Sequence, residues 1–380
     1  MGWSRWLAAG LGAIAIATTM GACRGDDPIA SEQPPAADAD ELDRRLILEN
    51  ATLNQADDDG KPLWDINAAR VAYSPDREEA ELESLTGNFY EDGELALQIR
   101  AREGTLLRSG EEIVLEGDIS AIDPRNEAVL RAQEARWFPD KQQLILRENF
   151  SGNHPRLDLT ADEGIYDAVA QSFTARGDIK AVAKEPSVLL QAEVVVWNIA
   201  KEIVSSDRPL QIDRFDENTT TDRITAERAT VNLGAEVVTL RGNVELRSVE
   251  PPVQIASNLI AWRIADRIIS TNMPIRIVHA AAEIDVTGNR GRYDLAREIV
   301  TLSGGVEGRS TPNEAELYTN RLEWNIRNQQ MRAQGDVRYR QENPLLIAKG
   351  DSAVGNLKVR KISLRSKKSQ SQGVVSEFEF

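Results

Sequence analysis

Cysteine and histidine are scarce in this chain of 380 residues, and each shortage excludes a class of protein. Cys23 is the only cysteine, so a framework of intrachain disulfides is impossible. His154 and His279 are the only histidines, and neither has a second histidine or a cysteine at metal-ligand spacing. We therefore predict a protein without a metal site and without a cofactor.

The chain also lacks the short motifs of common enzymes. It contains no G-x-S-x-G elbow, no phosphate-binding loop and no dinucleotide fingerprint. Its 61 Asp and Glu residues leave open a pair of catalytic carboxylates, as in a glycan-active β-helix enzyme. The acidic residues that we can place lie on solvated strand faces. We predict that the protein is not an enzyme and keep the β-helix enzyme as an alternative.

Positive charge is in the minority, and the formal net charge of −16 argues against nucleic acid as a partner. A basic stretch lies near the C-terminus and allows two interpretations. On an edge strand its side chains would block unwanted pairing; alternatively, they would meet an acidic partner or lipid phosphates. We predict a basic, mobile tail over residues 358–380. Its basic residues are Lys358, Arg360, Lys361, Arg365, Lys367 and Lys368.

Long apolar runs are absent apart from one at the N-terminus. Arg5 precedes an apolar run from Trp6 to about Met20, and small residues follow directly before Cys23. This order is typical of a secretory signal, and the run is shorter than the ~20 residues that span a bilayer. Residues 1–23 are predicted to be a lipoprotein-type signal with lipidation at Cys23, or else an uncleaved anchor; soluble release is the third alternative. Residues 24–43, acidic and proline-rich, are predicted to be a disordered tether.

The rest of the chain contains a repeat. Five segments share the pattern apolar-x-apolar-x-Gly-x-apolar-x-apolar, and charged residues occur only at the x positions. This alternation is typical of strands with one dry and one solvated face. The glycine in the dry row is unusual, because glycine weakens a strand interior. The candidate groove residues in these segments are Ile113, Leu115, Gly117, Ile119, Phe173, Gly177, Ile179, Val238, Leu240, Gly242, Val244, Leu246, Leu302, Gly304, Val306, Met331, Gly335 and Val337.

A second pattern alternates with the first. Alanine precedes an aromatic residue by five positions, as in Ala192 and Trp197, and two copies, Ala256 with Trp262 and Thr287 with Tyr293, have an extra residue. These marks recur about every 31 residues, which is typical of stacked supersecondary units. In some repeats a proline replaces the glycine, so the full unit is about 62 residues long. We predict an elongated all-β architecture. The prolines are Pro209 and Pro274.

The glycines of the first pattern allow two interpretations. They either make corners around an interior filled by side chains, or remove side-chain volume and leave a groove for an apolar guest. The first favours a structural or adhesive β-repeat protein of the envelope with a filled core. The second favours a lipid conduit.

The N-terminal part of the repeat resembles a known family. The segment "LILENATLNQADDDGKPLWDINAARVAY", followed by "GTLLRSGEEIVLEGDISA", is similar to the start of the LptC family, and A-x-x-x-x-Y and L-x-G-x-V repeats are shared with LptA- and OstA-like proteins. The resemblance covers about residues 44–350. The chain has about twice as many repeats as the compact form of the family.

The resemblance implies a fold, a function and partners. The fold is an open β-jellyroll, a U-shaped stack of antiparallel strands with a hydrophobic interior, over residues 44–357. The repeats form either one continuous groove or two tandem halves, and the polar segment 213–222, which lacks alternation, is the candidate division. The function is to bind the acyl chains of lipopolysaccharide, and to pass this lipid from the inner-membrane ABC transporter to a periplasmic LptA-like bridge. The protein is expected to be anchored in the inner membrane and to face the periplasm. The transporter is expected at the N-terminal edge, about 46–53, and the bridge at the C-terminal edge, about 345–364.

Overall fold

The structure is a computed structural model of the chain. It describes residues 46–56, 60, 62–91, 94–108, 111–124, 128–138, 141, 143–155, 157–167, 170–184, 187–217, 219–250, 252–312, 314–342, 345–356, 361–365 and 375–379. The predicted signal, its Cys23 and the predicted tether lie outside the described residues. Two compact units are distinguished: one contains the chain up to Phe150 together with Ile165–Val169, and the other contains Ser151–Gly164 and the chain from Ala170 onward.

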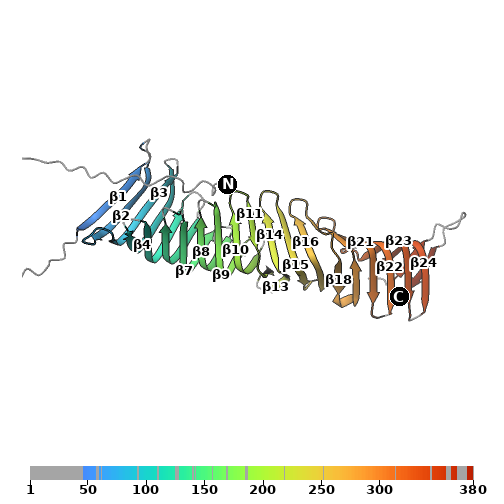
Figure 1. The fold of residues 1–380 in the computed structure, drawn as a ribbon. Helices are drawn as coiled ribbons and strands as arrows, with labels where there is room; N and C mark the ends of the chain where they lie inside the picture. Colours follow the sequence, from blue (N-terminus) through green and yellow to red (C-terminus); the bar gives the residue numbers. More distant parts are fainter. Residues whose placement is uncertain are drawn as a thin grey trace, which may run out of the picture. The chain divides into compact units, whose positions relative to one another are not determined.

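The described secondary structure consists of antiparallel strands with a short 3-10 turn at Ala280–Ala282, which confirms the all-β, jellyroll-like fold. In the first unit, six successive strands pair in order, each with the next (Figure 1). These strands are β1 (Ile47–Ala56), β2 (Pro62–Tyr73), β3 (Ala80–Glu91), β4 (Glu94–Leu107), β5 (Glu112–Asp123) and β6 (Ala128–Phe138). They are followed by β7 (Gln143–His154) and β8 (Leu157–Asp167), which contribute residues to both units.

The second unit alternates long strands with strands that are interrupted near their middle. The long strands are β9 (Ser172–Ala183), β10 (Val188–Asn198), β15 (Val237–Ser248), β16 (Val253–Arg263), β21 (Ile299–Ser310), β22 (Ala315–Asn325), β23 (Gln330–Gln341) and β24 (Leu346–Asn356). The interrupted ones are β11 (Ile203–Ser206) with β12 (Leu210–Asp216), β13 (Thr219–Ala226) with β14 (Arg228–Asn232), β17 (Ile268–Thr271) with β18 (Ile275–His279), and β19 (Ile284–Gly288) with β20 (Arg290–Asp294). The unit ends with β25 (Lys361–Arg365) and β26 (Val375–Glu379).

The prolines of the repeat mark two of these interruptions. Pro209 lies between β11 and β12, and Pro274 lies between β17 and β18. Proline has no N–H for the strand ladder, so it is tolerated where pairing stops. Both halves of β11–β12 still pair with the long strand β10, and both halves of β17–β18 pair with β16. Two long strands followed by two interrupted ones form the predicted unit of about 62 residues.

The glycines of the repeat lie at β-bulges, which corrects their predicted place in the apolar row. Gly242 and Asn243 together oppose Asn258, because the register shifts between Arg241 and Val244. Both bulge residues have positive φ, 75° and 43°, a region that glycine adopts without steric cost. The five bulges are Gly117–Asp118, Gly177–Asp178, Gly242–Asn243, Gly304–Gly305 and Gly335–Asp336.

The side-chain space next to these glycines is already taken by exposed polar groups of the preceding repeat strand. A Cβ on Gly242 would meet the carboxylate of Glu227, and one on Gly117 would meet the guanidinium of Arg102. At Gly177, Gly304 and Gly335 the neighbours are Asp162, Asn289 and Asn320. The glycines therefore bend the strand, as predicted, but they do not open space among apolar side chains. That part of the prediction is wrong.

The bulge also explains the five-residue spacing from alanine to the aromatic residue. In a regular strand, residues an odd number of positions apart point to opposite faces, so the two share a face only where the pairing shifts between them. Ala192 opposes Ile179 and Trp197 opposes Phe173, and the register shifts between Ala192 and Val194. In the next repeat Ser257, not the predicted Ala256, opposes the residue after the bulge, Val244. Ser257 lies five positions before Trp262, so this copy, which had one extra residue in the sequence, is regular in the structure.

Two predicted boundaries are corrected. Residues 213–222 form the end of β12, the start of β13 and their connection, and Asp213 pairs with Arg223 across that hairpin. The segment therefore lies inside the second unit. Strands also continue beyond residue 357, because β25 pairs with β24, and β26 pairs with β25.

Candidate functional site

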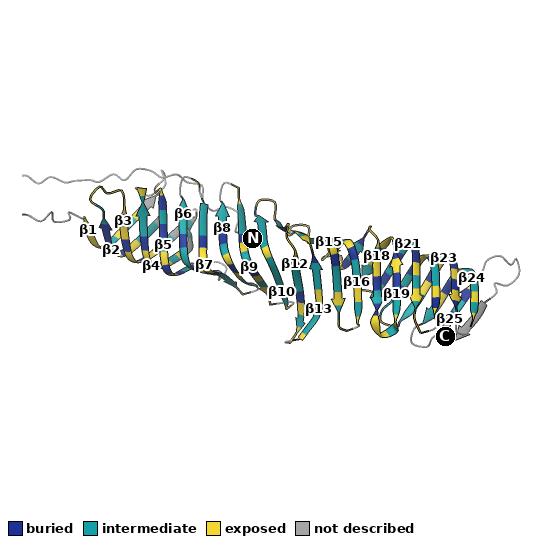
Figure 2. Cartoon of the chain, turned by 60° about the horizontal axis from the view of Figure 1, so that its bottom comes forward, coloured by how far each residue is buried: buried dark blue, intermediate teal, exposed yellow. Residues whose placement is uncertain are grey.

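Each long strand of the second unit has two arms, which meet at its own bulge or opposite the bulge of a neighbouring strand. Arm A consists of the β15 half Val237–Arg241, of β14, β17, β20 and β25, and of the halves of β16 and β21–β24 that align with them. Arm B consists of the other half of β15, of β13, β18 and β19, and of the remaining halves. Burial is highest near the middle of successive strands, where the arms meet (Figure 2).

The apolar side chains directly after the bulges form the most buried layer, which we call the vertex. Val244, Val306 and Val337 are each at most 1% exposed. Opposite Val306, the fully buried Thr319 places its hydroxyl 2.9 Å from the carbonyl oxygen of Gln334 and 3.2 Å from that of Gly335. The hydroxyl thereby satisfies backbone carbonyls that the bulge removes from the regular ladder.

Away from the vertex several inward-facing side chains are only partly buried, whereas others, such as Trp324 and Tyr339, remain buried. Val238 and Leu246 lie at the two ends of the β15 row, and both are intermediate in exposure, whereas Leu240 and Val244 between them are buried. In β23 the same gradient runs from Met331, which is partly buried, to the buried Ala333 and Val337. The apolar interior is thus closed at the vertex and accessible between the arms. This arrangement makes a groove.

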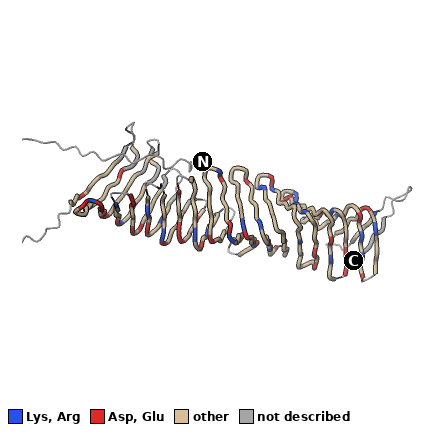
Figure 3. Tube along the Cα trace, in the orientation of Figure 1, with Lys and Arg blue, Asp and Glu red and all other residues tan. Residues whose placement is uncertain are grey.

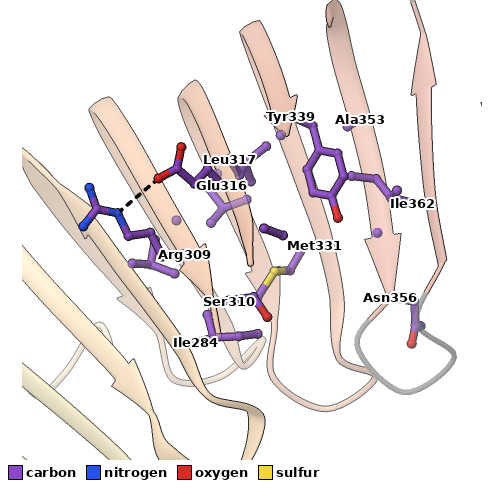
Figure 4. Close-up of a pocket in the computed structure, with 16 residues that line it drawn as sticks. Ile284, Arg309, Ser310, Glu316, Leu317, Met331, Tyr339, Ala353, Asn356 and Ile362 are labelled. Atoms are coloured by element: carbon purple, nitrogen blue, oxygen red, sulfur yellow. Dashed lines mark ion pairs between the residues drawn. The ribbon is translucent and has the colours of Figure 1, made fainter. Parts of the chain in front are cut away.

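The groove contains a pocket between the arms of β19–β25 (Figure 4). Its cavity volume is about 100 Å³. Arm A contributes Met331 and Ile362, and arm B contributes Ile284, Leu317 and Tyr339. The remaining lining residues are Val286, Gly308, Arg309, Ser310, Ala315, Glu316, Leu322, Ala333, Ala353, Gly355 and Asn356. Most of the lining is apolar, so the pocket suits a hydrocarbon group.

The polar groups of this pocket are already paired with each other or lie at its border. The Arg309 guanidinium is 3.9 Å from the Glu316 carboxylate, and both side chains are largely exposed (Figure 4). The Tyr339 hydroxyl donates to the Gln341 side-chain carbonyl at 2.8 Å, away from solvent. No charge is therefore left unpaired against the apolar lining, among the residues that the structure describes.

A second, smaller pocket of about 10 Å³ lies next to Trp324. Val286 and Leu322 line both pockets, so the two belong to one apolar interior. The Trp324 ring is 5% exposed and lies 5.8 Å from the His279 ring, centroid to centroid. Its buried indole N–H has no hydrogen-bond partner in the described part of the chain. His279 is occupied locally, because its Nδ1 accepts a hydrogen bond from the Ala282 backbone N–H at 3.2 Å.

The structure brings several predicted groove residues together. Leu302, Val306 and Val337 belong to one buried cluster, with Met331 packed against it. Leu240 and Val244 belong to another, with Val238 packed against it. In β9, Ile179 is 1% exposed and Phe173 is partly buried, and in the first unit Ile119 is buried while Ile113 and Leu115 are partly buried.

Only Met331 of the predicted residues lines the larger pocket, and only Leu302 lines the smaller one. The glycine pattern does not include Ile284, Leu317 and Leu322, so the sequence did not predict them as groove residues. Leu317 and Leu322 lie on β22, a strand that carries the alanine-type mark instead of the glycine. Their signal is the break in alternation around Thr319, which moves both leucines to the interior.

Other kinds of site were searched within the described residues. No group of three or more His, Cys, Asp or Glu side chains there is placed to hold a metal ion. From Leu46 onward, no described helix is long and apolar enough to span a membrane.

The comparison with protein families gives a match over residues 12–145 and 211–311, which is more than half of the chain. The matching model describes LptC-related proteins of lipopolysaccharide assembly. The chain belongs to this family. The predicted resemblance is therefore confirmed. Membership gives the chain a role in lipopolysaccharide transport, as a component that faces the periplasm. The family consists of transport components and is not an enzyme family. No curated protein matches the chain.

Proposed function

We propose that the groove between arms A and B holds acyl chains of lipopolysaccharide while the lipid moves from the inner-membrane ABC transporter toward the outer membrane. The observation that carries the proposal is the gradient from the buried vertex to the partly exposed Val238, Leu246 and Met331. Partly exposed apolar side chains on facing arms gain free energy when a hydrocarbon chain covers them. Each buried CH₂ group contributes about 0.8 kcal/mol.

The same free energy per CH₂ group explains why a lipid carrier needs a continuous interior. Exposing one long acyl chain to water costs on the order of 10 kcal/mol. Inward-facing apolar residues recur along the long strands of the second unit, from Ile179 through Val244 and Val306 to Val337. A chain that slides along such a row keeps its apolar contacts at each step. The ATP-hydrolysing transporter supplies the direction of movement.

The two ends of the strand series are the proposed partner sites. Within the described residues, β1 pairs only with β2, and its apolar Leu46, Ile47 and Leu48 are exposed. At the other end, Leu345 and Ile347 are 68% and 64% exposed, and β25 covers β24 only over Ser352–Asn356. Unpaired strand edges are templates for strand addition. We assign the first edge to the transporter and the second to an LptA-like bridge.

The proposal also includes the N-terminal segment. Residues 1–23 would hold the protein on the periplasmic side of the inner membrane, either through a lipid on Cys23 or as an uncleaved anchor. Mass spectrometry of the mature protein distinguishes these forms. A diacylglycerol mass on Cys23 as the first residue supports the lipoprotein, and an intact Met1 supports the anchor.

Photocrosslinking in cells tests the groove. A photoreactive side chain is placed at Met331, which lines the pocket, and separately at the exposed Arg338 on the same strand. Val337 and Tyr339 on either side of Arg338 are buried, so Arg338 points to the opposite face of β23 and is the control. We expect lipopolysaccharide adducts at position 331 only, and their loss when ATP hydrolysis is blocked. Equal adducts at both positions, or none at 331 in folded protein, would show that the interior is a filled structural core.

A further inference from the structure

The outer face of arm A carries a second feature, on the side opposite the groove. We propose that this face, between β20 and β25, binds an anionic lipid surface through exposed arginines, most of which have no acidic partner among the described residues. The proposal does not depend on what occupies the groove, because it concerns the side chains that point away from the interior. We call these residues the arginine face: Arg290, Arg292, Arg321, Arg332 and Arg365.

Strand register places three of these arginines in one row. Arg290 opposes Ser303, which opposes Arg321 on β22. The row continues through Gln334 and Ser352 to Arg365 on β25. No member of this row is acidic, although the chain as a whole has a net charge of −16.

The neighbouring row, two residues along each strand, contains the other two arginines. From β20 to β25 it runs from Arg292 through Thr301 and Glu323 to Arg332, Val354 and Ser363, and the register continues to Glu377 on β26. Since side chains two positions apart share a face of the sheet, both rows project to the same side. The interior alternates with them, as the buried Leu302, Leu322 and Ala333 show. Across twelve positions the face has five arginines and one acid, Glu323.

These arginines are exposed and mostly unpaired. Four of them form no ion pair with any residue that the structure describes: Arg290, Arg292, Arg332 and Arg365. The fifth, Arg321, forms a loose pair with Glu323 at 3.7 Å, in which both side chains are well exposed. Exposed ion pairs of this kind contribute little free energy, so Glu323 alone does not neutralise the five arginines of the face.

Arm B of the same strands is the internal comparison. It also carries arginines on its outer face, but these are matched by acids. Figure 3 colours the basic and acidic residues along the strands. Arg276 is paired with Asp285 at 2.6 Å, and Arg309 is flanked in register by two acids, Asp285 and Glu316. Arg338 and Arg340 are paired with Asp336 and Glu342, respectively. The unpaired arginines are therefore a property of one arm and not of the strands in general.

The spacing of the arginines favours an extended surface over a single bound anion. Neighbouring strands lie about 4.8 Å apart, so Arg290 and Arg321 are separated by about 10 Å, and Arg321 and Arg365 by about 14 Å. Side chains at these separations do not converge on one phosphate group. They match several phosphates spread over a plane, as in a bilayer of anionic lipids, where each basic residue near the surface strengthens attachment about fivefold.

Composition argues against a protein partner on this face. The twelve positions contain no aromatic residue and one apolar residue, Val354, whereas protein interfaces are centred on buried aromatic or apolar anchors. The acidic remainder of the chain does not oppose the contact strongly, because charges more than about 10 Å away are screened at physiological salt.

Arginine modification tests the proposal on the full chain. The protein is reconstituted into vesicles of phosphatidylcholine alone, or of phosphatidylcholine with phosphatidylglycerol as the minority lipid, and is treated with phenylglyoxal. Mass spectrometry then reports the modification rate at each arginine. With phosphatidylglycerol present, we expect Arg292, Arg332 and Arg365 to react about fivefold more slowly. In 1 M salt, where the screening length is about 3 Å, this protection should be lost.

The internal controls are Arg276, Arg309 and Arg340 on arm B, whose rates should not change. Equal protection of both arms, or none on arm A, would overturn the proposal. Free tripolyphosphate at the same phosphate concentration distinguishes the two sources of phosphate. If it protects arm A as well as the vesicles do, the face binds a soluble anion, and the lipid-surface proposal is wrong.

A pair of triple variants completes the test. In R290Q/R321Q/R332Q, the protection of the remaining Arg292 and Arg365 should disappear, whereas in the matched variant R276Q/R309Q/R340Q it should persist. Retained protection in the first variant would contradict the proposal. The crosslinking test at Met331 concerns the groove alone, so failure there and failure here are separate results.

Discussion

The carboxylate of Glu227 occupies the position that a side chain on Gly242 would take. Asn243, the second residue of that bulge, donates a hydrogen bond to the same carboxylate at 2.5 Å. Both bulge residues have positive φ, so the corner of β15 is held by a left-handed backbone and by a polar contact on the outside of the strand. This relationship leads to the first prediction.

Replacing Gly242 with alanine is expected to lower the free energy of unfolding by about 1–2 kcal/mol from the left-handed backbone, with a further loss from the contact with Glu227. Chemical denaturation measures this loss. The control is Gly308→Ala, because that Cβ would meet Leu317 and Val286 at ordinary contact distances of 3.7 and 3.8 Å. A double variant with Glu227→Ala should recover only the contact part. An equal effect at Gly242 and Gly308 would rule out the backbone explanation.

Truncation at the vertex is expected to cost more stability than truncation along an arm. Val306→Ala removes two buried methyl groups from a fully buried side chain and should destabilise the protein by about 2 kcal/mol. Met331→Ala, at a partly buried position, should cost less per atom removed, while weakening the binding of a fluorescent acyl probe. If Met331→Ala is the more destabilising variant, the arms are as tightly packed as the vertex.

The Thr319 hydroxyl is expected to stabilise the corner between β22 and β23. Thr319→Val keeps the shape of the side chain but leaves the carbonyls of Gln334 and Gly335 without this donor. The loss should be about 1 kcal/mol in the free energy of unfolding. Thr301→Val on the outer face of β21 is the control and should change stability little. A neutral result at Thr319 would mean that water replaces the hydroxyl.

Acid is expected to weaken the outer face of arm B at Glu245. Hydrogen bonding from Arg247 lowers the pKa of the Glu245 carboxyl below its ordinary value of 4.5, Gln254 adds a second hydrogen bond, and burial opposes both. A carboxyl with a lowered folded-state pKa stabilises the protein above the unfolded-state value. That contribution is therefore lost as the pH falls below about 4.5.

Titration of Glu245 by NMR in the wild type and in Arg247→Gln checks this assignment. The variant should raise the pKa of Glu245 toward 4.5, and its stability should vary less between pH 5 and pH 3 than that of the wild type. Arg241→Gln, at an arginine without an ion pair among the described residues, should leave the Glu245 titration unchanged. An unchanged pKa in Arg247→Gln would assign the shift to another neighbour.

The strands, their dry faces and the repeat of about 62 residues were predictable, because alternation and proline placement are local properties of the sequence. The role of the glycines was not. Leu240, Gly242 and Val244 keep a spacing of two along the chain, so the sequence looks like one unbroken row. The bulge appears only when the register with β16 is known, since two residues of β15 then face Asn258 alone. Likewise, the apparent extra residue between Ala256 and Trp262 disappears once Ser257 is seen opposite Val244.

The pocket could not be predicted, because the residues that line it lie far apart in the sequence. Ile284 and Ile362 line the same cavity from different strands, and no local pattern connects them. By itself, the sequence determined which side chains would be dry, where proline replaces glycine in the repeat and which family the repeats resemble, because these follow from hydrophobic period and local composition. Only the tertiary structure decided which dry side chains are sealed at the vertex, which remain accessible in the groove and which arginines lack an acid. These properties depend on the register between strands, and register is set by bulges and pairing across the sheet.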